Sequence, residues 1–260
     1  MRIAIEHQIV HRPRAGRSAV VQMLRLTPEN FDDQTVAHWR IDVDCDARFR
    51  RGHDGFGNAV TMLYIEGAPE MVTITATGEV LTSDAHGLIH GATETLPPAL
   101  FLRATPVTPG DDAIAAFAKQ AADGTEGPLA ALHALNLALH RRFAIDREAG
   151  PTGIDAGQAF AQERVTPCDL AHIFCVGARS LGIPARYVSG FAAWNGDARG
   201  QAHCWAEAHV EALGWIGFDP STGLSPQDTH VRIAVALDAT GAASLAGEPW
   251  GQAAGSGGPQ

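Results

Sequence analysis

Apolar and polar residues alternate along much of the first hundred residues of the chain. The alternation is strict over 39–45, where one parity holds Trp39, Ile41, Val43 and Cys45. A period of two residues is typical of β-strands that bury one face. The other runs of this kind are 3–9, 20–26, 59–65 and 71–76, with a short continuation at 80–81 after Gly78. Short strands separated by turns predict an antiparallel, sandwich-like, β-rich domain over residues 1–100.

Helical periodicity replaces this alternation after Pro97-Pro98 and the linker-like segment 105–110. One helix is expected to begin at Asp111-Asp112, because acidic side chains in a first turn complement the helix dipole. Another is expected over 128–142, where leucines recur at helical spacing and two arginines close the last turn. The change of pattern predicts a boundary between two domains near residues 97–110.

The third expected helix begins near Pro167 and ends at 181–182, since Gly182 suits the position after a helix. Strands are expected beyond it, over 185–191, 202–211 and 215–219. This mixture predicts an α+β domain over residues 105–240. The last segment, 241–260, is a Gly-rich tail for which no ordered structure is expected.

The charge balance and the cysteine count exclude several classes of protein. The chain has 19 basic and 29 acidic residues, a net charge of −10 at pH 7. Nucleic-acid and anionic membrane partners require clustered Lys and Arg, so neither is expected. No apolar run approaches the roughly 20 residues that span a bilayer, and no signal peptide is visible. Four cysteines are too few for a disulfide scaffold, which predicts a reduced, cytoplasmic protein.

A candidate nucleophile lies at the start of the third helix. Cys168 follows Thr166-Pro167, and the N–H groups and dipole of a helix N-terminus stabilise a thiolate. A thiolate needs a base, and the base needs an acceptor that orients it. His203 lies 35 residues after Cys168 (203 − 168), and Asp219 lies 16 residues after His203 (219 − 203). These three side chains converge if the strands pair antiparallel, although many chains offer such triples.

Longer segments carry a resemblance to the bacterial transglutaminase-like family, whose members are often described as cysteine proteases. They are LGIPARYVSGF (181–191), AHCWAEAHVEALGWIGFDPSTG (202–223) and DTHVRIAVALD (228–238). The turn DGFGN (54–58) and the linker LFLRATPVT (100–108) are similar to the β-rich N-terminal domain of that family. The resemblance covers nearly the whole chain and implies a papain-like α+β core with a Cys-His-Asp triad.

By this resemblance, His203 matches the histidine of a His-Ala-Trp-Ala-Glu motif, and Asp219 matches the aspartate of Gly-Phe-Asp-Pro. The cysteine departs from the pattern. Family members read Gly-Val-Cys-Gln-Asp-Phe-Ala-His at the helix start, and a gap-free alignment over 160–172 puts Pro167 in the place of the nucleophile. Cys168 then stands one position late, a rotation of about 100° along a helix. It reaches His203 only if the first helical turn is rewound.

Neighbouring residues have ordinary structural interpretations. Cys175 and Cys204 are expected to be small core residues, and His172 to be a hydrogen-bonded helix histidine. Trp205 is expected either to pack in the core or to line a substrate cleft. Glu207 is expected to be a solvated charge at a strand edge. No Cys or His pair has zinc-like spacing and flanks, so no metal is expected.

The resemblance implies acyl transfer at an amide bond of a peptide or protein substrate. Cys168 would attack the carbonyl as a thiolate, His203 would carry the proton, and Asp219 would orient the imidazole. No cofactor is expected. The alternative is a catalytically inactive member that binds a peptide or partner in the old cleft, with Cys168 as a residue of the capping turn. An acyltransferase with a thioester donor is a third interpretation, for which the chain shows no donor motif.

Overall fold

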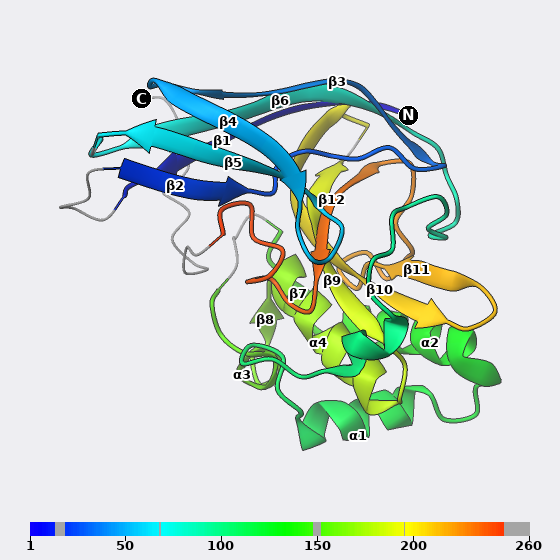
Figure 1. Cartoon of the computed structure of the whole chain (residues 1–260). Helices are drawn as coiled ribbons and strands as arrows, with labels where there is room; N and C mark the ends of the chain where they lie inside the picture. Colours follow the sequence, from blue (N-terminus) through cyan, green and yellow to red (C-terminus); the bar gives the residue numbers. More distant parts are fainter. Residues whose placement is uncertain (14–18, 68, 148–151, 195, 247–260) are drawn as a thin grey trace.

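The computed structural model describes the chain except residues 14–18, 68, 148–151, 195 and 247–260, which include most of the predicted Gly-rich tail (Figure 1). The strands are β1 (Arg2–His11), β2 (Ala19–Leu24), β3 (Gln34–Val43), β4 (Ala47–His53), β5 (Ala59–Glu66), β6 (Val72–Thr82), β7 (Ala144–Ile145), β8 (Arg164–Val165), β9 (Ala185–Ala193), β10 (Arg199–Val210), β11 (Gly214–Phe218) and β12 (His230–Ala236). The helices are η1 (Pro98–Leu102), α1 (Asp112–Ala121), α2 (Gly127–Arg142), α3 (Ala156–Phe160) and α4 (Pro167–Ser180).

Strands from both halves of the chain join in one sheet. Within the described residues it is 7-stranded, with the order β12-β9-β10-β1-β6-β3, and β11 pairs with β10 beside this path. The junction is short: β1 runs parallel to β10 and meets it only at Ala4↔Arg199 and Ile5↔Gly200. The boundary predicted near residues 97–110 therefore does not divide the chain into two separate sheets. A period-2 pattern identifies the two faces of a strand, but it does not identify the neighbouring strand. Gly200 permits the close contact with β1, because a Cβ at this position would lie 2.9 Å from Cγ1 of Ile5.

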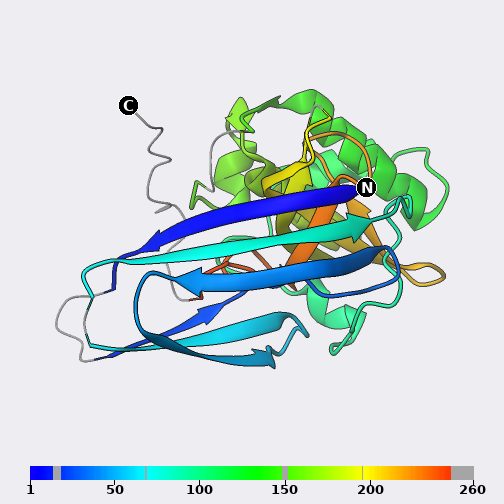
Figure 2. The same cartoon turned by 90° about the horizontal axis from the view of Figure 1, so that it is seen from above.

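The N-terminal region forms the predicted sandwich. The strands β1, β6 and β3 lie over a 3-stranded sheet of order β2-β5-β4 (Figure 2). Apolar side chains of one parity from both layers fill the space between them, including Val20, Leu24, Leu63, Ile65, Val72 and Ile74. The chain thus has a β-rich N-terminal region followed by an α+β region, as the sequence predicts.

Two features of this region differ from the prediction. The strand β6 runs through Gly78 without a turn, because the glycine makes room for Trp39 on the neighbouring strand β3. A Cβ at Gly78 would lie 2.4 Å from a ring carbon of Trp39. The strand β4 was not predicted, since six of its seven residues are exposed and no apolar alternation marks it.

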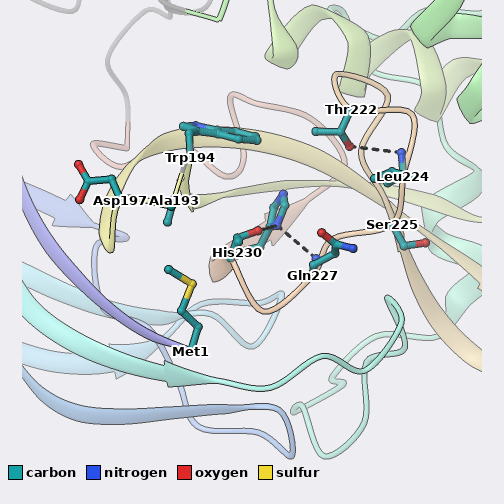
Figure 3. Close-up of a pocket in the computed structure, with 11 residues that line it drawn as sticks. Met1, Ala193, Trp194, Asp197, Thr222, Leu224, Ser225, Gln227 and His230 are labelled. Atoms are coloured by element: carbon teal, nitrogen blue, oxygen red, sulfur yellow. Dashed lines mark hydrogen bonds between the residues drawn. The ribbon is translucent and has the colours of Figure 1, made fainter.

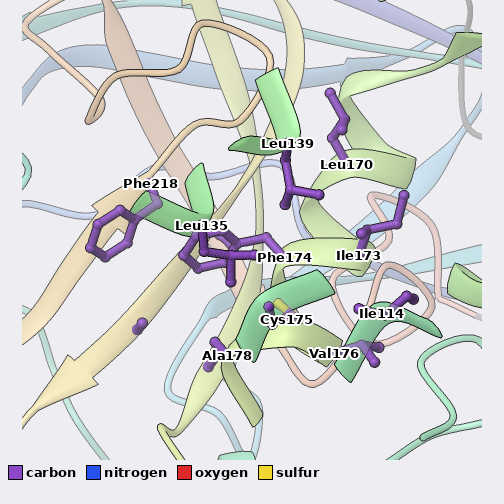
Figure 4. Close-up of a cluster of buried hydrophobic side chains, with 14 of the residues drawn as sticks. Ile114, Leu135, Leu139, Leu170, Ile173, Phe174, Cys175, Val176, Ala178 and Phe218 are labelled. Carbon is purple, nitrogen blue, oxygen red and sulfur yellow. The ribbon is translucent and has the colours of Figure 1, made fainter. Parts of the chain in front are cut away.

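The helices pack on the face of the sheet to which β10 contributes Ala206 and Ala208. The helix α4 lies against β9 and β10 and is covered in turn by α1, α2 and α3. Figure 4 shows side chains of α4 packed with those of Ile114 on α1, Leu135 on α2 and Phe218 on β11. Its start and end agree with the prediction, as does the start of α1, where Asp111 accepts a hydrogen bond from the N–H of Ile114. No helix in the described part of the chain is long and apolar enough to cross a membrane.

The edge strand β12, which was not predicted, is capped by side-chain amides of the N-terminal region. Asn58 donates through Nδ2 to the carbonyl of Val235 and accepts through Oδ1 from its N–H, both at 2.8 Å. Gln34 makes the same pair of bonds with Arg232, at 3.0 and 2.7 Å. These amides satisfy backbone groups that an open sheet edge would leave unpaired.

We expect Asn58→Ala to lower the free energy of unfolding by about 1–3 kcal/mol, because it leaves the buried N–H and C=O of Val235 without partners. Denaturant titration measures this. The control is Gln201→Ala at an exposed position on β10, which should stay within about 0.5 kcal/mol of the wild type. Equal losses in the two variants would contradict the capping role.

Candidate active site

Three elements place side chains on one face of the sheet. The strand β10 provides His203 and Trp205, β12 provides His230, and Asp219 directly follows β11. On β9, Gly190 lies opposite His203 and Ala192 lies opposite His230. Residues opposite one another on paired strands, and residues two apart on one strand, share a face. The pairing therefore brings His203 and His230 to the same side.

His203 and Asp219 form the hydrogen bond that the sequence predicts. The Nε2 atom of His203 lies 2.9 Å from Oδ2 of Asp219, and both side chains are buried. Since Nε2 meets the carboxylate, Nδ1 is the ring nitrogen left to face a nucleophile or a ligand. The geometry is that of a base with its orienting acceptor.

Asp219 has further partners that fix its position. Its Oδ1 accepts from the N–H of Ser221 at 2.9 Å, and its Oδ2 also lies 3.3 Å from Nε2 of His230. Burial alone would raise the pKa of the Asp219 carboxyl, but the interactions with His203 and His230 hold that pKa well below its usual range. Asp219 is therefore a carboxylate.

His230 belongs to the site and was missed by the reasoning from sequence. It lies in the family-like segment 228–238, so its position in that segment was the available signal. Its Nδ1 accepts from the N–H of Gln227 at 3.3 Å and lies 3.0 Å from Oγ1 of Thr229. Since Nδ1 accepts a hydrogen bond, the ring proton of the neutral imidazole lies on Nε2, which donates it to Asp219.

Tryptophan rings enclose the two histidines. Trp194, just after β9, meets His203 edge-on at 5.0 Å between ring centroids, and Trp205 lies 5.3 Å from His230. Trp194 also lines a pocket of about 300 Å³ together with His230 (Figure 3). The polar side chains of this pocket include Asp197, Thr222, Ser225, Gln227 and Thr229. Trp194 was not predicted, because it lies beyond the segments with family resemblance.

Cys168 does not lie beside His203. It forms a disulfide with Cys204, with the two Cα atoms 5.0 Å apart. Cys204 follows His203 on β10, so their side chains point to opposite faces of the strand, and Cys204 packs with Cys168 and Ala171 of α4. The expectation of reduced cysteines is wrong for this pair, since a helix start and a strand distant in sequence bring the two sulfur atoms together.

The start of α4 is a regular capped turn. Thr166 and Asp169 form a capping box, in which the Thr166 hydroxyl accepts from the Asp169 N–H and the Asp169 carboxylate accepts from the Thr166 N–H. Thr152 adds a hydrogen bond of 2.7 Å to the same carboxylate. Pro167 occupies the first helical position, where it is well tolerated. The first turn is therefore not rewound toward His203.

Glu207 is not the solvated charge that the sequence suggested. It is fully buried and accepts from Nε of Arg186 at 2.6 Å and from Nε of Arg232 at 2.8 Å. Burial alone would raise the pKa of Glu207, but Arg232 and Arg186 hold it below its usual range. Arg186 also binds Glu94 through both terminal nitrogens and lies over the ring of Trp215.

The other residues singled out from the sequence have structural roles. Cys175 is buried in the helical core, and burial raises the pKa of its thiol to about 11, so the thiol stays protonated. His172 accepts a hydrogen bond at Nε2 from the N–H of Ala239 at 3.0 Å, as expected for a helix histidine with a partner. Cys175 is thus a core residue and His172 a hydrogen-bonded helix histidine, and both side chains are buried.

Comparison with known proteins identifies the family. Residues 115–220 match the family model described as the transglutaminase-like superfamily, and residues 3–81 match the bacterial transglutaminase-like N-terminal region. The chain therefore belongs to the bacterial transglutaminase-like family. The uncharacterised protein ML0607 of Mycobacterium leprae is 28% identical over 262 residues, which cover 95% of this chain and 92% of that protein.

The fold has a solved counterpart. The structure is similar to that of the "Putative Cysteine Protease" from Cytophaga hutchinsonii, with a TM-score of 0.74 and 18% sequence identity. The similarity covers 95% of this chain and 85% of the other. It supports the fold of both regions together.

The buried imidazole of His172 should make stability depend on pH. Burial lowers the pKa of His172 to about 4, from an ordinary value of about 6.5. Between these values the unfolded chain binds a proton that the folded chain does not, so stability falls as the pH falls, by up to about 1.4 kcal/mol per pH unit. Denaturant titrations at pH 7, 6 and 5 should show a flatter dependence in His172→Gln, which keeps an acceptor without this titration.

The matched control is His90→Gln at an exposed position, which should keep the pH dependence of the wild type. If the free energy of unfolding depends on pH in the same way in the wild type and in His172→Gln, His172 does not remain neutral in the folded protein.

Proposed function

We propose that the protein binds a peptide or protein segment in the pocket beside His203 and Asp219, and that it performs no acyl transfer while Cys168 is bonded to Cys204. The observation that carries this proposal is the position of the disulfide on the face of β10 opposite to His203. Among the described residues, the pocket side of the sheet thus has the base and its carboxylate but no thiol.

The pocket chemistry suits an amide-containing ligand. Hydroxyl and amide side chains of Ser225 and Gln227 line it, and such groups can bind the N–H and C=O groups of a peptide. The indole of Trp194 offers a flat apolar wall for a side chain. A volume of about 300 Å³ is at the small end for ligand pockets, so we expect it to take one side chain with its flanking amides.

A second candidate function is acyl transfer from an amide bond by Cys168, His203 and Asp219. The acyl acceptor would be water or an amine. The intact hydrogen bond between His203 and Asp219 favours it. This function needs a dithiol reductant, which would convert the disulfide into two thiols and become oxidised itself. It also needs a new path for the first turn of α4, which the capping box of Thr166 and Asp169 opposes.

In the acyl-transfer reaction, the Cys168 thiolate would attack the carbonyl carbon and the protonated imidazole of His203 would give its proton to the leaving amine. Water or a second amine would then release the acyl group from sulfur. Asp219 would hold the ring of His203 throughout. The reaction is hydrolysis when water accepts the acyl group and transamidation when an amine accepts it.

The two candidates differ in their response to reduction. We expect no hydrolysis of β-casein and no incorporation of dansylcadaverine into it, either before or after treatment with dithiothreitol. Non-reducing mass spectrometry establishes the state of the disulfide in each sample. Activity that appears on reduction, disappears in Cys168→Ala and persists in Cys45→Ala would establish acyl transfer by the reduced protein, the second candidate function. Activity in the disulfide-bonded protein would contradict the first proposal.

Peptide binding should depend on Trp194. We expect Trp194→Ala to weaken binding of benzyloxycarbonyl-Gln-Gly about tenfold, the size of effect expected when one aromatic contact is lost. Isothermal titration calorimetry measures the affinity. Leu213→Ala, in the exposed turn between β10 and β11, is the control and should bind like the wild type. Equal affinities of Trp194→Ala and the wild type would place the peptide elsewhere.

A further inference from the structure

We infer that His203, Asp219 and His230 form a binding site for one divalent transition-metal ion, with Zn²⁺ as the expected occupant. Each of the three residues offers one ligand atom within 4.8 Å of those of the other two. Nε2 of both histidines lies near Oδ2 of Asp219. Imidazole nitrogen and carboxylate oxygen are ordinary zinc ligands. The inference does not rest on peptide binding, because it uses only these three side chains and their immediate partners.

The spacing of these atoms suits a tetrahedral ion. Zinc binds nitrogen and oxygen at about 2.0–2.1 Å, so two ligands of a tetrahedral ion lie about 3.3 Å apart. Oδ2 of Asp219 lies 2.9 Å from Nε2 of His203 and 3.3 Å from Nε2 of His230. Both rings thus direct the same nitrogen at one carboxylate oxygen. An ion can replace these two hydrogen bonds with small movements of the side chains.

The partners of the three residues can support a bound ion. The N–H of Ser221 fixes Oδ1 of Asp219 and leaves Oδ2 for the metal. A metal-bound His230 must carry its proton on Nδ1 instead of Nε2, and Oγ1 of Thr229, 3.0 Å from Nδ1, can accept it. The proton moves from one nitrogen to the other through solvent, so the imidazole stays neutral. The hydrogen bond from the Gln227 N–H is lost in exchange.

The pocket gives the ion a route and an open coordination position. His230 lines the pocket of about 300 Å³, and its ring centroid lies 5.6 Å from that of His203. Three protein ligands leave one position of a tetrahedral zinc for water or for a ligand oxygen, as in catalytic rather than structural zinc sites. Next to the site, Oγ of Ser221 is buried and has no hydrogen-bond partner among the described residues, which provides one more polar atom for a metal-bound water.

Metal titration of the full-length, disulfide-bonded protein tests the inference. The protein is treated with EDTA and dialysed, and Zn²⁺ is added in a calorimeter. A parallel titration with Co²⁺ follows the visible absorption of a tetrahedral cobalt ion. We expect one equivalent to bind to the wild type and none to His230→Ala. Thr229→Val, which removes only the acceptor for Nδ1, should weaken binding about 10–100-fold.

The control variant is His90→Ala, an exposed histidine outside the cluster, and it should bind like the wild type. Nitrogen-15 spectra of histidine in the wild type provide a readout that needs no variant, because Nε2 of two rings should shift on addition of Zn²⁺. No stoichiometric binding, or equal binding by His230→Ala, would overturn the inference. Binding of benzyloxycarbonyl-Gln-Gly in EDTA is measured separately. Failure of the zinc site and failure of peptide binding can therefore be told apart.

Discussion

The buried carboxylate of Glu207 holds three strands together on the pocket face of the sheet. It lies on β10 and binds Arg186 of β9 and Arg232 of β12. A buried carboxylate without partners is strongly unfavourable. The strand register that pairs Glu207 with both arginines is therefore favoured over registers shifted along the strands. His203 lies on the same strand and face as Glu207, and His230 lies two residues before Arg232. The register that pairs these charges therefore also brings both histidines to Asp219.

The alternation of side chains along β10 separates two kinds of chemistry that are adjacent in sequence. His203 lies on the face of β10 where it meets Asp219, and Cys204 faces α4, where it bonds to Cys168. One strand thus carries a base on one side and a disulfide on the other. We expect reduction of the disulfide to leave the hydrogen bond between His203 and Asp219 in place, because the side chains of His203 and Cys204 point to opposite faces of β10. The thiol of Cys168 that reduction would release must still move to the opposite face of β10 before it can contact the imidazole of His203.

Sequence patterns predicted the longer helices and several strands, but they missed β4 and β12 and did not predict how the strands pair. The bounds of α4, the start of α1 near Asp111-Asp112 and the bond between His203 and Asp219 follow from local rules and from family-like segments. The joining of β1 to β10 does not, because alternation is the same whichever strand lies alongside. Glu207 was misjudged for a related reason: its partners Arg186 and Arg232 lie on other strands, and only the register brings them near. The disulfide joins a helix start to a strand, a proximity that spacing along the chain does not contain.

The burial of Asp219 explains why a family-like His and Asp can occur in a chain in which Cys168 is bonded to Cys204. A fully buried carboxylate needs donors, and removing one of them leaves an uncompensated charge in the core. His203, His230 and the N–H of Ser221 supply those donors whether or not a thiol is near. Matching motifs therefore establish the position of the dyad without establishing catalysis. A bound Zn²⁺ would meet the same electrostatic requirement in another way, since its charge compensates the carboxylate directly while the two rings turn from donors into ligands.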